Sequence, residues 1–190
     1  MDPIVIDNFL PPKFFSEVKS VITSKAFIWF YKDCITFPGD SSDSLFSYGF
    51  EHPVVYEEEI INEELFYHYL REFYIRLLDT TKCRTVTKSR IDMVTYSPSK
   101  HQHSVHVDEY FDHIASVFYI TDSDAETTIY DQKCFDYDSL KTIDISKMSV
   151  LKKVFPKQNR LLIFDGRHLH TGSSPSEYKN RIIINTDLVK

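Results

Sequence analysis

The chain has 190 residues, 42% of them hydrophobic and 15% aromatic, and a formal net charge of −6 at pH 7. These values exclude an intrinsically disordered chain and predict a folded domain with a sizeable core. The negative charge and the lack of a lysine- and arginine-rich block argue against nucleic acid as a partner. No signal peptide is recognisable and no apolar run approaches the ~20 residues that cross a bilayer, so we expect a cytoplasmic protein without a membrane partner.

The first part of the chain is predicted to be mainly helical. Ile4–Ile6 is a candidate short strand, and residues 38–44 form a polar stretch that suggests a loop. Apolar residues recur at helical spacing over residues 13–23 and again over residues 56–79. This spacing predicts two helices that each bury one face.

From residue 84 onward the pattern changes to short segments rich in β-branched residues, separated by polar connections. The candidate strands are residues 84–96, 104–108, 115–120, 127–130, 142–145, 160–164 and 181–189. Helices followed by many short strands predict an α+β protein whose strands form a sandwich or barrel. We expect a single domain over residues 1–190, in which residues 1–83 give helical support to a β core of residues 84–190.

A histidine and an aspartate two residues apart, His106 and Asp108, lie in the candidate strand of residues 104–108. Side chains alternate between the two faces of a strand, so these two project together while Val105 and Val107 face the other layer. This arrangement suits an imidazole and a carboxylate that bind one metal ion. By itself, so short a motif more often marks the solvent-facing side of an edge strand.

A second group of polar residues follows the candidate strand of residues 160–164. Gly166 and Gly172, two of only four glycines in the chain, bracket a histidine pair that includes His170. Glycine permits a tight turn or a close approach of the backbone. Arg181 begins the next candidate strand, eleven positions after His170. The sequence therefore predicts a histidine near a sharp turn, with an arginine on a neighbouring strand.

Two histidines and one carboxylate on one face of a metal ion form the facial triad of non-haem iron(II) oxygenases. Three protein ligands leave three positions open, of which two can chelate a 2-oxo acid and one can receive dioxygen. A structural zinc site would instead be closed by four protein ligands. The residue types thus favour a catalytic iron site.

The order His106-x-Asp108, His170 and Arg181 resembles the 2-oxoglutarate/Fe(II)-dependent dioxygenase superfamily, in particular its prolyl-hydroxylase-like branch and short phage and bacterial members. The similarity extends from about residue 84 to residue 189. It implies a double-stranded β-helix, or jelly roll, buttressed by the N-terminal helices. It also implies iron(II), 2-oxoglutarate as cosubstrate and dioxygen, with ascorbate as a supporting reductant.

The resemblance assigns roles residue by residue. It makes His106, Asp108 and His170 the iron ligands, and Arg181 the residue that pairs with the distal carboxylate of 2-oxoglutarate. Arginine suits this role because its planar fork binds a carboxylate through two hydrogen bonds and stays charged in a pocket. The same resemblance places Tyr96 at a position that often hydrogen-bonds the cosubstrate or lines its pocket.

Two features near the arginine depart from or extend the family pattern. Ile183 stands where many members have serine or threonine, so a second hydrogen bond to the cosubstrate must come from elsewhere, and Tyr96 is the candidate. Ile183 and Asn185 lie at even spacing from Arg181 and are expected to face the same interior. Residues 124–128 lack the glycines of the Gly-Gly-x-Thr turn that members often have after the third strand.

The neighbouring histidines leave alternatives open. His168 can share a face with His170, but the spacing to the arginine favours His170 as the ligand. His101, His103 and His113 permit a multi-histidine zinc site, although His101 and His103 fall in a polar stretch that is typical of solvated loop residues. His113 is either exposed or lines the mouth of the site.

Two other residues have both a structural and a functional interpretation. Arg90 is either a surface arginine of an alternating strand or a contact in the pocket wall. Trp29 is a core residue, or one wall of a substrate cleft, as the resemblance allows for an N-terminal aromatic segment.

The resemblance implies a hydroxylase that oxidises a C–H bond of a peptidyl proline, another protein side chain or a small metabolite, and releases succinate and carbon dioxide. Its partner is then a peptide or small-molecule substrate. A non-enzymatic jelly-roll binding or virion module is the alternative from another class. A nucleic-acid demethylase is the alternative within the same chemistry, but residues 182–190 lack the second arginine that such relatives usually have.

Overall fold

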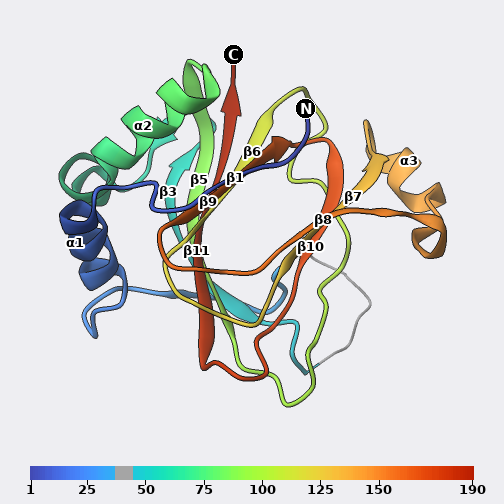
Figure 1. The fold of residues 1–190 in the computed structure, drawn as a ribbon, viewed down its shortest axis with the longest axis horizontal. Coiled ribbons are helices and arrows are strands. Elements are labelled where there is room, and N and C mark those ends of the chain that lie inside the picture. The colour runs from blue at the N-terminus through green and yellow to red at the C-terminus, as the bar shows by residue number, and fades with distance from the viewer. Residues whose placement is uncertain (37–44) are drawn as a thin grey trace.

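Two antiparallel sheets face each other in the computed structural model, which describes residues 1–36 and 45–190 (Figure 1). The loop expected at residues 38–44 lies outside this part. The larger sheet has the order β1-β9-β6-β11-β5-β3-β2, and β4 pairs with β3. Its strands are β1 (Ile4–Ile6), β2 (Phe30–Lys32), β3 (Gly49–Tyr56), β4 (Glu59–Ile60), β5 (Thr85–Thr95), β6 (Ile114–Tyr119), β9 (Arg160–Asp165) and β11 (Asn180–Val189).

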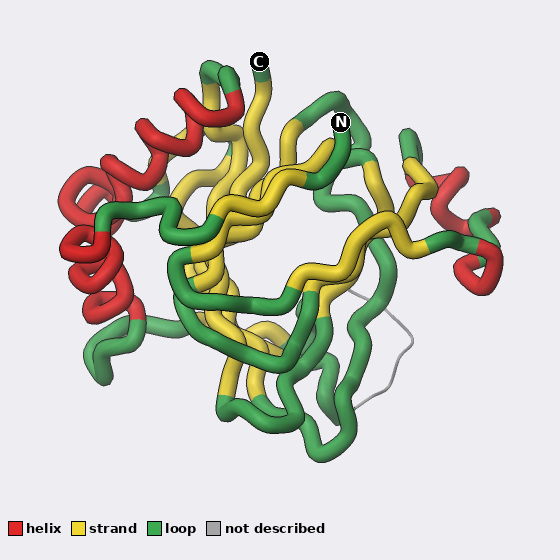
Figure 2. The backbone as a smooth tube through the Cα atoms, viewed as in Figure 1, coloured by secondary structure: helices red, strands yellow, loops and turns green. Residues whose placement is uncertain are grey.

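The smaller sheet has the order β10-β7-β8, with β7 at Thr127–Lys133, β8 at Val150–Val154 and β10 at His168–Gly172. Helix α1 (Pro12–Ile22) and helix α2 (Arg71–Thr81), which follows the π-helical segment η1 (Leu65–Leu70), lie together against the larger sheet (Figure 2). Helix α3 (Tyr137–Thr142) and the 3-10 turn η2 (Ile145–Lys147) connect β7 to β8 on the opposite side of the molecule. The described residues include no helix that is long and apolar enough to span a membrane.

One face of the larger sheet packs against the helices. Phe118 of β6 is fully buried there, and its ring lies 5.0 Å from Phe73 of α2 and 6.0 Å from Phe15 of α1, measured between centroids. Helix α1 buries Phe15, Val18 and Ile22, which recur at helical spacing and form one apolar face. The alternate residues of the strands complete this core: Ile91, Leu161, Ile163, Ile182, Ile184 and Leu188.

The other face of the larger sheet packs against the smaller sheet. Ile129 of β7 and Val154 of β8 contact a layer contributed by the larger sheet: Ala115, Val117, Tyr119, Leu162, Phe164 and Ile183. Strand β11 contributes to both faces, since Ile182 and Ile184 belong to the helix-side core while Ile183 belongs to this inner layer. The alternation of a strand thus places selected polar residues of β11 between the two sheets.

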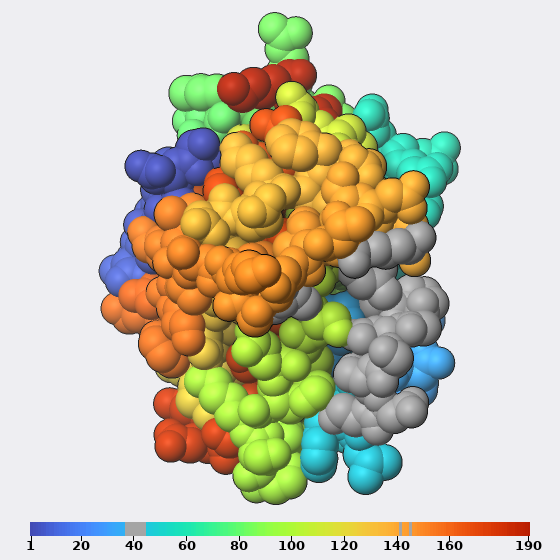
Figure 3. Space-filling model, turned by 90° about the vertical axis from the view of Figure 1, so that its right-hand side faces the viewer, coloured from blue at the N-terminus to red at the C-terminus, as the bar shows by residue number. Residues whose placement is uncertain are grey.

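The outer side of the smaller sheet forms a third apolar cluster. Val107, Tyr130, Cys134 and Leu169 are buried there, and Leu140, Ile143 and Met148 of the α3 region pack against them. Figure 3 shows the α3 region in orange, as a ridge above the yellow-green loop that follows β5. The same cluster holds Val107, so the α3 region and the segment around residue 107 share one apolar core.

The predicted α+β class is confirmed, and most predicted elements have counterparts at nearly the expected bounds. The strand predicted over residues 142–145 is wrong, because α3 ends at Thr142 and η2 begins at Ile145. β-branched residues suggested a strand there. The Asp136 carboxylate instead accepts a hydrogen bond from the backbone N–H of Ser139 at 2.7 Å and caps a short helix.

The strands β2, β3, β4, β8 and β10 were not among the predicted strands, and the helix expected from residue 56 begins only at Leu65. Strand β3 contains Pro53, which lies at a register shift against β5. Proline is tolerated in sheets mainly at edges and bulges, so its presence argued against a strand. Strand β3 therefore forms because it pairs with β5, and not because its residues individually favour a strand.

An ion-pair network joins the N-terminal strand to the β9 strand. The Asp7 carboxylate lies 2.6 Å from Arg160 Nε and 3.3 Å from Lys157 Nζ. The hydrogen bond from Arg160 is the main reason that the pKa of Asp7 falls to about 2. Because the folded pKa is below the unfolded value of about 4, the contribution to stability is complete above pH ~4 and is lost as pH falls towards 2.

We expect Asp7→Asn to lower the free energy of unfolding by about 1 kcal/mol at pH 7, a value limited by solvent screening of this partly exposed pair. The difference from wild type should vanish as the pH approaches 2. Urea denaturation at a series of pH values measures it, with Asp2→Asn at an exposed position as the control. A difference that stays constant with pH would contradict the assigned ion pair.

Candidate metal centre

Three predicted ligands come together between the two sheets. Ligand atoms of His106, Asp108 and His170 all lie within 4.8 Å of one another. His170 Nε2 is 3.3 Å from Asp108 Oδ2, and the ring centroids of the two histidines are 4.6 Å apart. Among the described residues this is the group whose His, Cys, Asp and Glu atoms are arranged to hold a metal ion.

The segment that contains His106 and Asp108 is not the regular strand that the sequence predicted. It pairs with β10 through one isolated bridge, where the backbone N–H of His106 donates to the carbonyl of His170 at 3.0 Å and the reverse bond is 2.9 Å. The expected alternation still holds, because Val107 is buried in the outer cluster while His106 and Asp108 turn inward. These two hydrogen bonds fix the histidines beside each other.

Backbone carbonyls set the tautomers of both histidines. His106 Nδ1 lies 2.9 Å from the carbonyl of Ser104, and His170 Nδ1 lies 3.0 Å from the carbonyl of His168. A carbonyl only accepts, so each Nδ1 carries the proton and each Nε2 offers its lone pair. Burial and the neighbouring His170 lower the pKa of His106 to about 4, which keeps this ring neutral near pH 7.

The Asp108 carboxylate is held in its ionised form. Burial opposes ionisation, but the contacts with His170 and with the nearby Arg90 outweigh it and hold the pKa of Asp108 well below its usual range. Its side chain is only 3% exposed, and Oδ2 has no hydrogen-bond partner among the described residues. Two imidazole nitrogens and one buried carboxylate oxygen therefore face a common point.

Arg181 lies behind this group in the inner layer. It is 4% exposed, donates to Thr127 Oγ1 at 2.7 Å and lies over the ring of Tyr119, 5.7 Å from its centroid. Tyr119 donates to the same Thr127 hydroxyl at 2.8 Å. Arg181 Nε has no hydrogen-bond partner in the described chain, and burial lowers the pKa of this guanidinium. Arg181 is thus a buried cation without an ion-pair partner among residues 1–36 and 45–190.

A cavity of about 60 Å³ connects Arg181 to the histidines. Ile183 and Asn185 line it, as their spacing from Arg181 predicted, and Asn185 Nδ2 lies 3.5 Å from Asp108 Oδ1. Gly172 also lines it, and a Cβ atom there would lie 3.1 Å from Arg181 Nη1. The glycine thus makes room for the guanidinium.

The structure does not bring Tyr96 into this group. Strand β5 ends at Thr95, and Tyr96 is 50% exposed and does not line the cavity. The sequence argument missed Tyr119 and Thr127, which contact Arg181 instead. A signal for Tyr119 existed, since its alternation with Ala115 and Val117 predicts a buried tyrosine whose hydroxyl needs a polar partner.

The other histidines lie outside the ligand group. His168 Nδ1 lies 2.8 Å from the carbonyl of Tyr130, and the register shifts between His168 and His170. His103 is buried beside Ser174. His113 is buried, with Nε2 3.7 Å from an Asp187 oxygen, and its ring lies where a Cβ of Gly166 would be. His113 is therefore neither exposed nor a ligand in this group.

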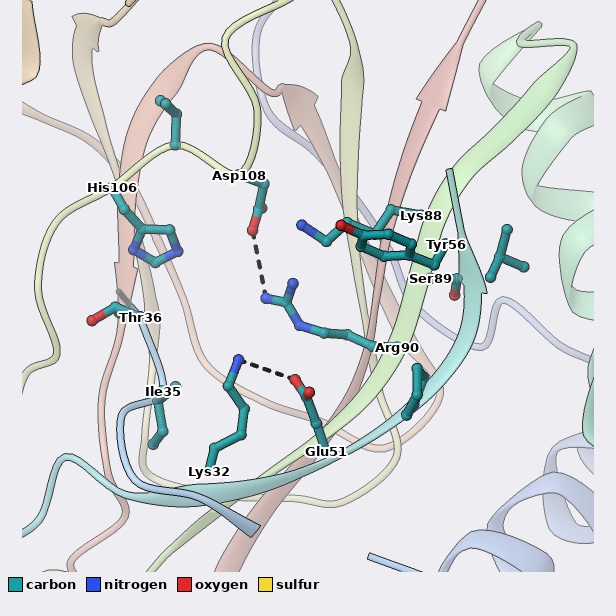
Figure 4. A pocket seen from close by; sticks show the side chains of 13 residues that line it. Lys32, Ile35, Thr36, Glu51, Tyr56, Lys88, Ser89, Arg90, His106 and Asp108 are labelled. Carbon is teal, nitrogen blue, oxygen red and sulfur yellow. Dashed lines mark ion pairs between the residues drawn. The ribbon is translucent and has the colours of Figure 1, made fainter. Parts of the chain in front are cut away.

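Arg90 reaches the site, whereas Trp29 belongs to the helix-side core, which it meets as a partly buried residue. Arg90 lines both the inner cavity and a larger cavity of about 330 Å³ that opens beside His106 and Asp108. Figure 4 shows this larger cavity, with Arg90 pointing towards Asp108 and with the Lys32–Glu51 ion pair below it. The ligand group thus has an inner cavity on one side and an open mouth on the other.

Known proteins were compared with the chain in sequence and in structure. No protein-family model and no curated protein sequence matches it. Among solved structures, the α-ketoglutarate-dependent epimerase SnoN of nogalamycin biosynthesis is similar with a TM-score of 0.69 at 9% identity, over 99% of this chain and 76% of SnoN. SnoN has also been solved in complex with Fe3+, α-ketoglutarate (2-oxoglutarate) and nogalamycin RO.

A prolyl hydroxylase from Trichoplax adhaerens, in complex with a hypoxia inducible factor peptide, has a TM-score of 0.65 at 13% identity, over 98% of this chain and 83% of the enzyme. An oxidoreductase of the 2OG-Fe(II) oxygenase family from Burkholderia pseudomallei has a TM-score of 0.64 at 9% identity, over 98% and 85% of the two chains. The predicted resemblance is confirmed at the level of fold. The chain has the double-stranded β-helix of the 2-oxoglutarate/Fe(II) oxygenases, supported by N-terminal helices.

Proposed function

We propose that this protein is an iron(II)- and 2-oxoglutarate-dependent oxygenase that hydroxylates a C–H bond of a peptide side chain or small metabolite. The observation that carries the proposal is the convergence of His106, Asp108 and His170 beside a cavity that ends at the buried Arg181. The same fold in SnoN and in the prolyl hydroxylase supports it.

The donor set fits iron(II). Two imidazole nitrogens and one carboxylate oxygen match the facial triad, and Asp108 Oδ2 is a buried acceptor without a hydrogen-bond donor among the described residues. A buried carboxylate oxygen without a donor costs free energy, so a cation beside Oδ2 stabilises the group. His106, Asp108 and His170 would hold the metal.

The inner cavity fits the distal carboxylate of 2-oxoglutarate. Arg181 is buried without a carboxylate partner among the described residues, and its Nε has no acceptor there. A carboxylate that enters the cavity would pair with it through charge-assisted hydrogen bonds. Thr127 holds the guanidinium in place, and the hydroxyls of Thr127 and Tyr119 replace the contribution first assigned to Tyr96.

Iron(II) with 2-oxoglutarate and dioxygen supplies oxidation of a C–H bond, with release of succinate and carbon dioxide. The chain itself contributes position. Arg181 orients the cosubstrate, and apolar Val117 and Ile183 limit the water that reaches the inner cavity. The mouth beside His106 is where a substrate carbon would approach, between Arg90 and residues of β3.

The test is uncoupled turnover, which needs no prime substrate. Purified metal-free protein receives iron(II), 2-oxoglutarate and ascorbate in air, and succinate is measured. We expect slow succinate formation that disappears when iron or 2-oxoglutarate is omitted. If no succinate forms, anaerobic titration with iron(II) and 2-oxoglutarate decides through the weak visible charge-transfer band. A flat spectrum would overturn the proposal in favour of a binding module.

A further inference from the structure

Arg90 is a partly buried arginine that contacts the carboxylate of the ligand group. It lies on β5, opposite Asn185 of β11 and Pro53 of β3 in the sheet register. Its Nε lies 3.0 Å from both oxygens of Asp92, and its Nη2 lies 3.5 Å from Asp108 Oδ1. The side chain is 18% exposed. One guanidinium therefore spans two carboxylates, and only one of them belongs to the ligand group.

The two oxygens of Asp108 have different surroundings. Oδ2 faces His170 Nε2 at 3.3 Å. Oδ1 faces away from that histidine, towards Arg90 Nη2 and Asn185 Nδ2, each at 3.5 Å. The carboxylate thus has one oxygen on the ligand side and one oxygen on the side of the two donors.

We propose that Arg90 is a positioning residue that turns Asp108 so that only Oδ2 is offered to the metal. This inference rests on the proposed iron site. A carboxylate without such a contact can rotate and bind a metal through both oxygens, which would occupy a coordination position that the cosubstrate needs. By engaging Oδ1, Arg90 keeps the protein contribution at three ligand atoms.

Asp92 anchors the guanidinium. Arg90 and Asp92 are two residues apart on β5, so both face the inner side of the sheet. The charge of Asp92 is the main influence that raises the pKa of Arg90 against the effect of burial, so the arginine stays charged. The pair is neutral as a whole, which limits the repulsion between the guanidinium and a metal ion. A planar fork is needed, because one lysine ammonium cannot span both carboxylates.

Two variants test the positioning without changing the net charge of the pair. Arg90→Lys keeps the cation and removes the fork, and Arg90→Met with Asp92→Asn removes both charges together. The matched controls are Arg160→Lys and Arg160→Met with Asp7→Asn. Arg160 makes the same kind of pair with Asp7, is 21% exposed and lies on the β9 strand away from the ligand group.

The measurements are the dissociation constant of Mn(II), followed by electron paramagnetic resonance, and the visible spectrum of the Co(II)-loaded protein at saturation. We expect both Arg90 variants to weaken metal binding by ~10–100-fold and to change the Co(II) spectrum. A loss of this size is typical when a residue that hydrogen-bonds a metal ligand, without contacting the metal, is removed. The Arg160 variants should match wild type. If the double variant does not fold, the Arg90→Lys result decides.

Wild-type affinity and spectrum in the Arg90 variants would overturn the inference. That result is expected if Arg90 only contacts an anionic substrate at the mouth. The proposed function is tested separately in the same titration, because wild type must bind the metal and His170→Ala must not. A wild-type chain that binds no metal would overturn both.

Discussion

His170→Ala is expected to lose metal binding and uncoupled turnover together, whereas His168→Ala is expected to keep both. His170 presents Nε2 to Asp108 at 3.3 Å, and its replacement leaves only two ligands. His168 is outside the ligand group and contributes only its backbone carbonyl to His170, which alanine retains. His170→Ala should lose more than ~100-fold in metal affinity, because removal of a residue that only hydrogen-bonds a ligand already costs about 10–100-fold.

Mn(II) titration measures the metal affinity of the two variants, and succinate formation measures their uncoupled turnover. Circular dichroism at the same temperature checks that each variant is folded. His168→Ala removes a buried ring, so some loss of thermal stability is expected without loss of the metal. If His168→Ala lost the metal and His170→Ala retained it, the ligand assignment between the two histidines would be reversed. Retention in both variants would remove the β10 histidines from the site altogether.

Arg181→Met is expected to raise the half-saturating concentration of 2-oxoglutarate by ~10–100-fold and to leave metal affinity nearly unchanged. A hydrogen bond to a charged group contributes about 1.5–3 kcal/mol, and each 1.4 kcal/mol corresponds to about tenfold. Methionine fills much of the volume without a charge. Arg181 does not belong to the ligand group, so the metal should still bind.

Succinate formation as a function of 2-oxoglutarate concentration gives the half-saturating concentration, and Mn(II) titration gives the metal affinity. Arg160→Met is the matched control, because that arginine pairs with Asp7 near the surface. An unchanged half-saturating concentration in Arg181→Met would show that the inner cavity is not where the distal carboxylate binds. The His170 and Arg181 variants together separate the metal-binding function from the cosubstrate-binding function.

Much of the candidate site is encoded in local spacing. His106 and Asp108 turn inward together because residues two apart in an extended segment share a face, even though the segment forms only one isolated bridge. The same rule correctly placed Ile183 and Asn185 on the cavity side of β11 with Arg181. Tyr96, which the resemblance and not this rule assigned to the pocket, lies one residue beyond the end of β5 and is half exposed.

The sequence by itself determined the α+β class, the shared side of His106 and Asp108, and the face of β11 that Arg181, Ile183 and Asn185 share, because each depends on a period of two or of about 3.6 residues along the chain. The resemblance added His170. Only the tertiary structure decided that β3 pairs with β5, that Thr127 and Tyr119 hold Arg181, and that Arg90 spans Asp92 and Asp108. These contacts join strands that are distant in sequence, and their partners are selected by register and burial. Local preference contains no information about either.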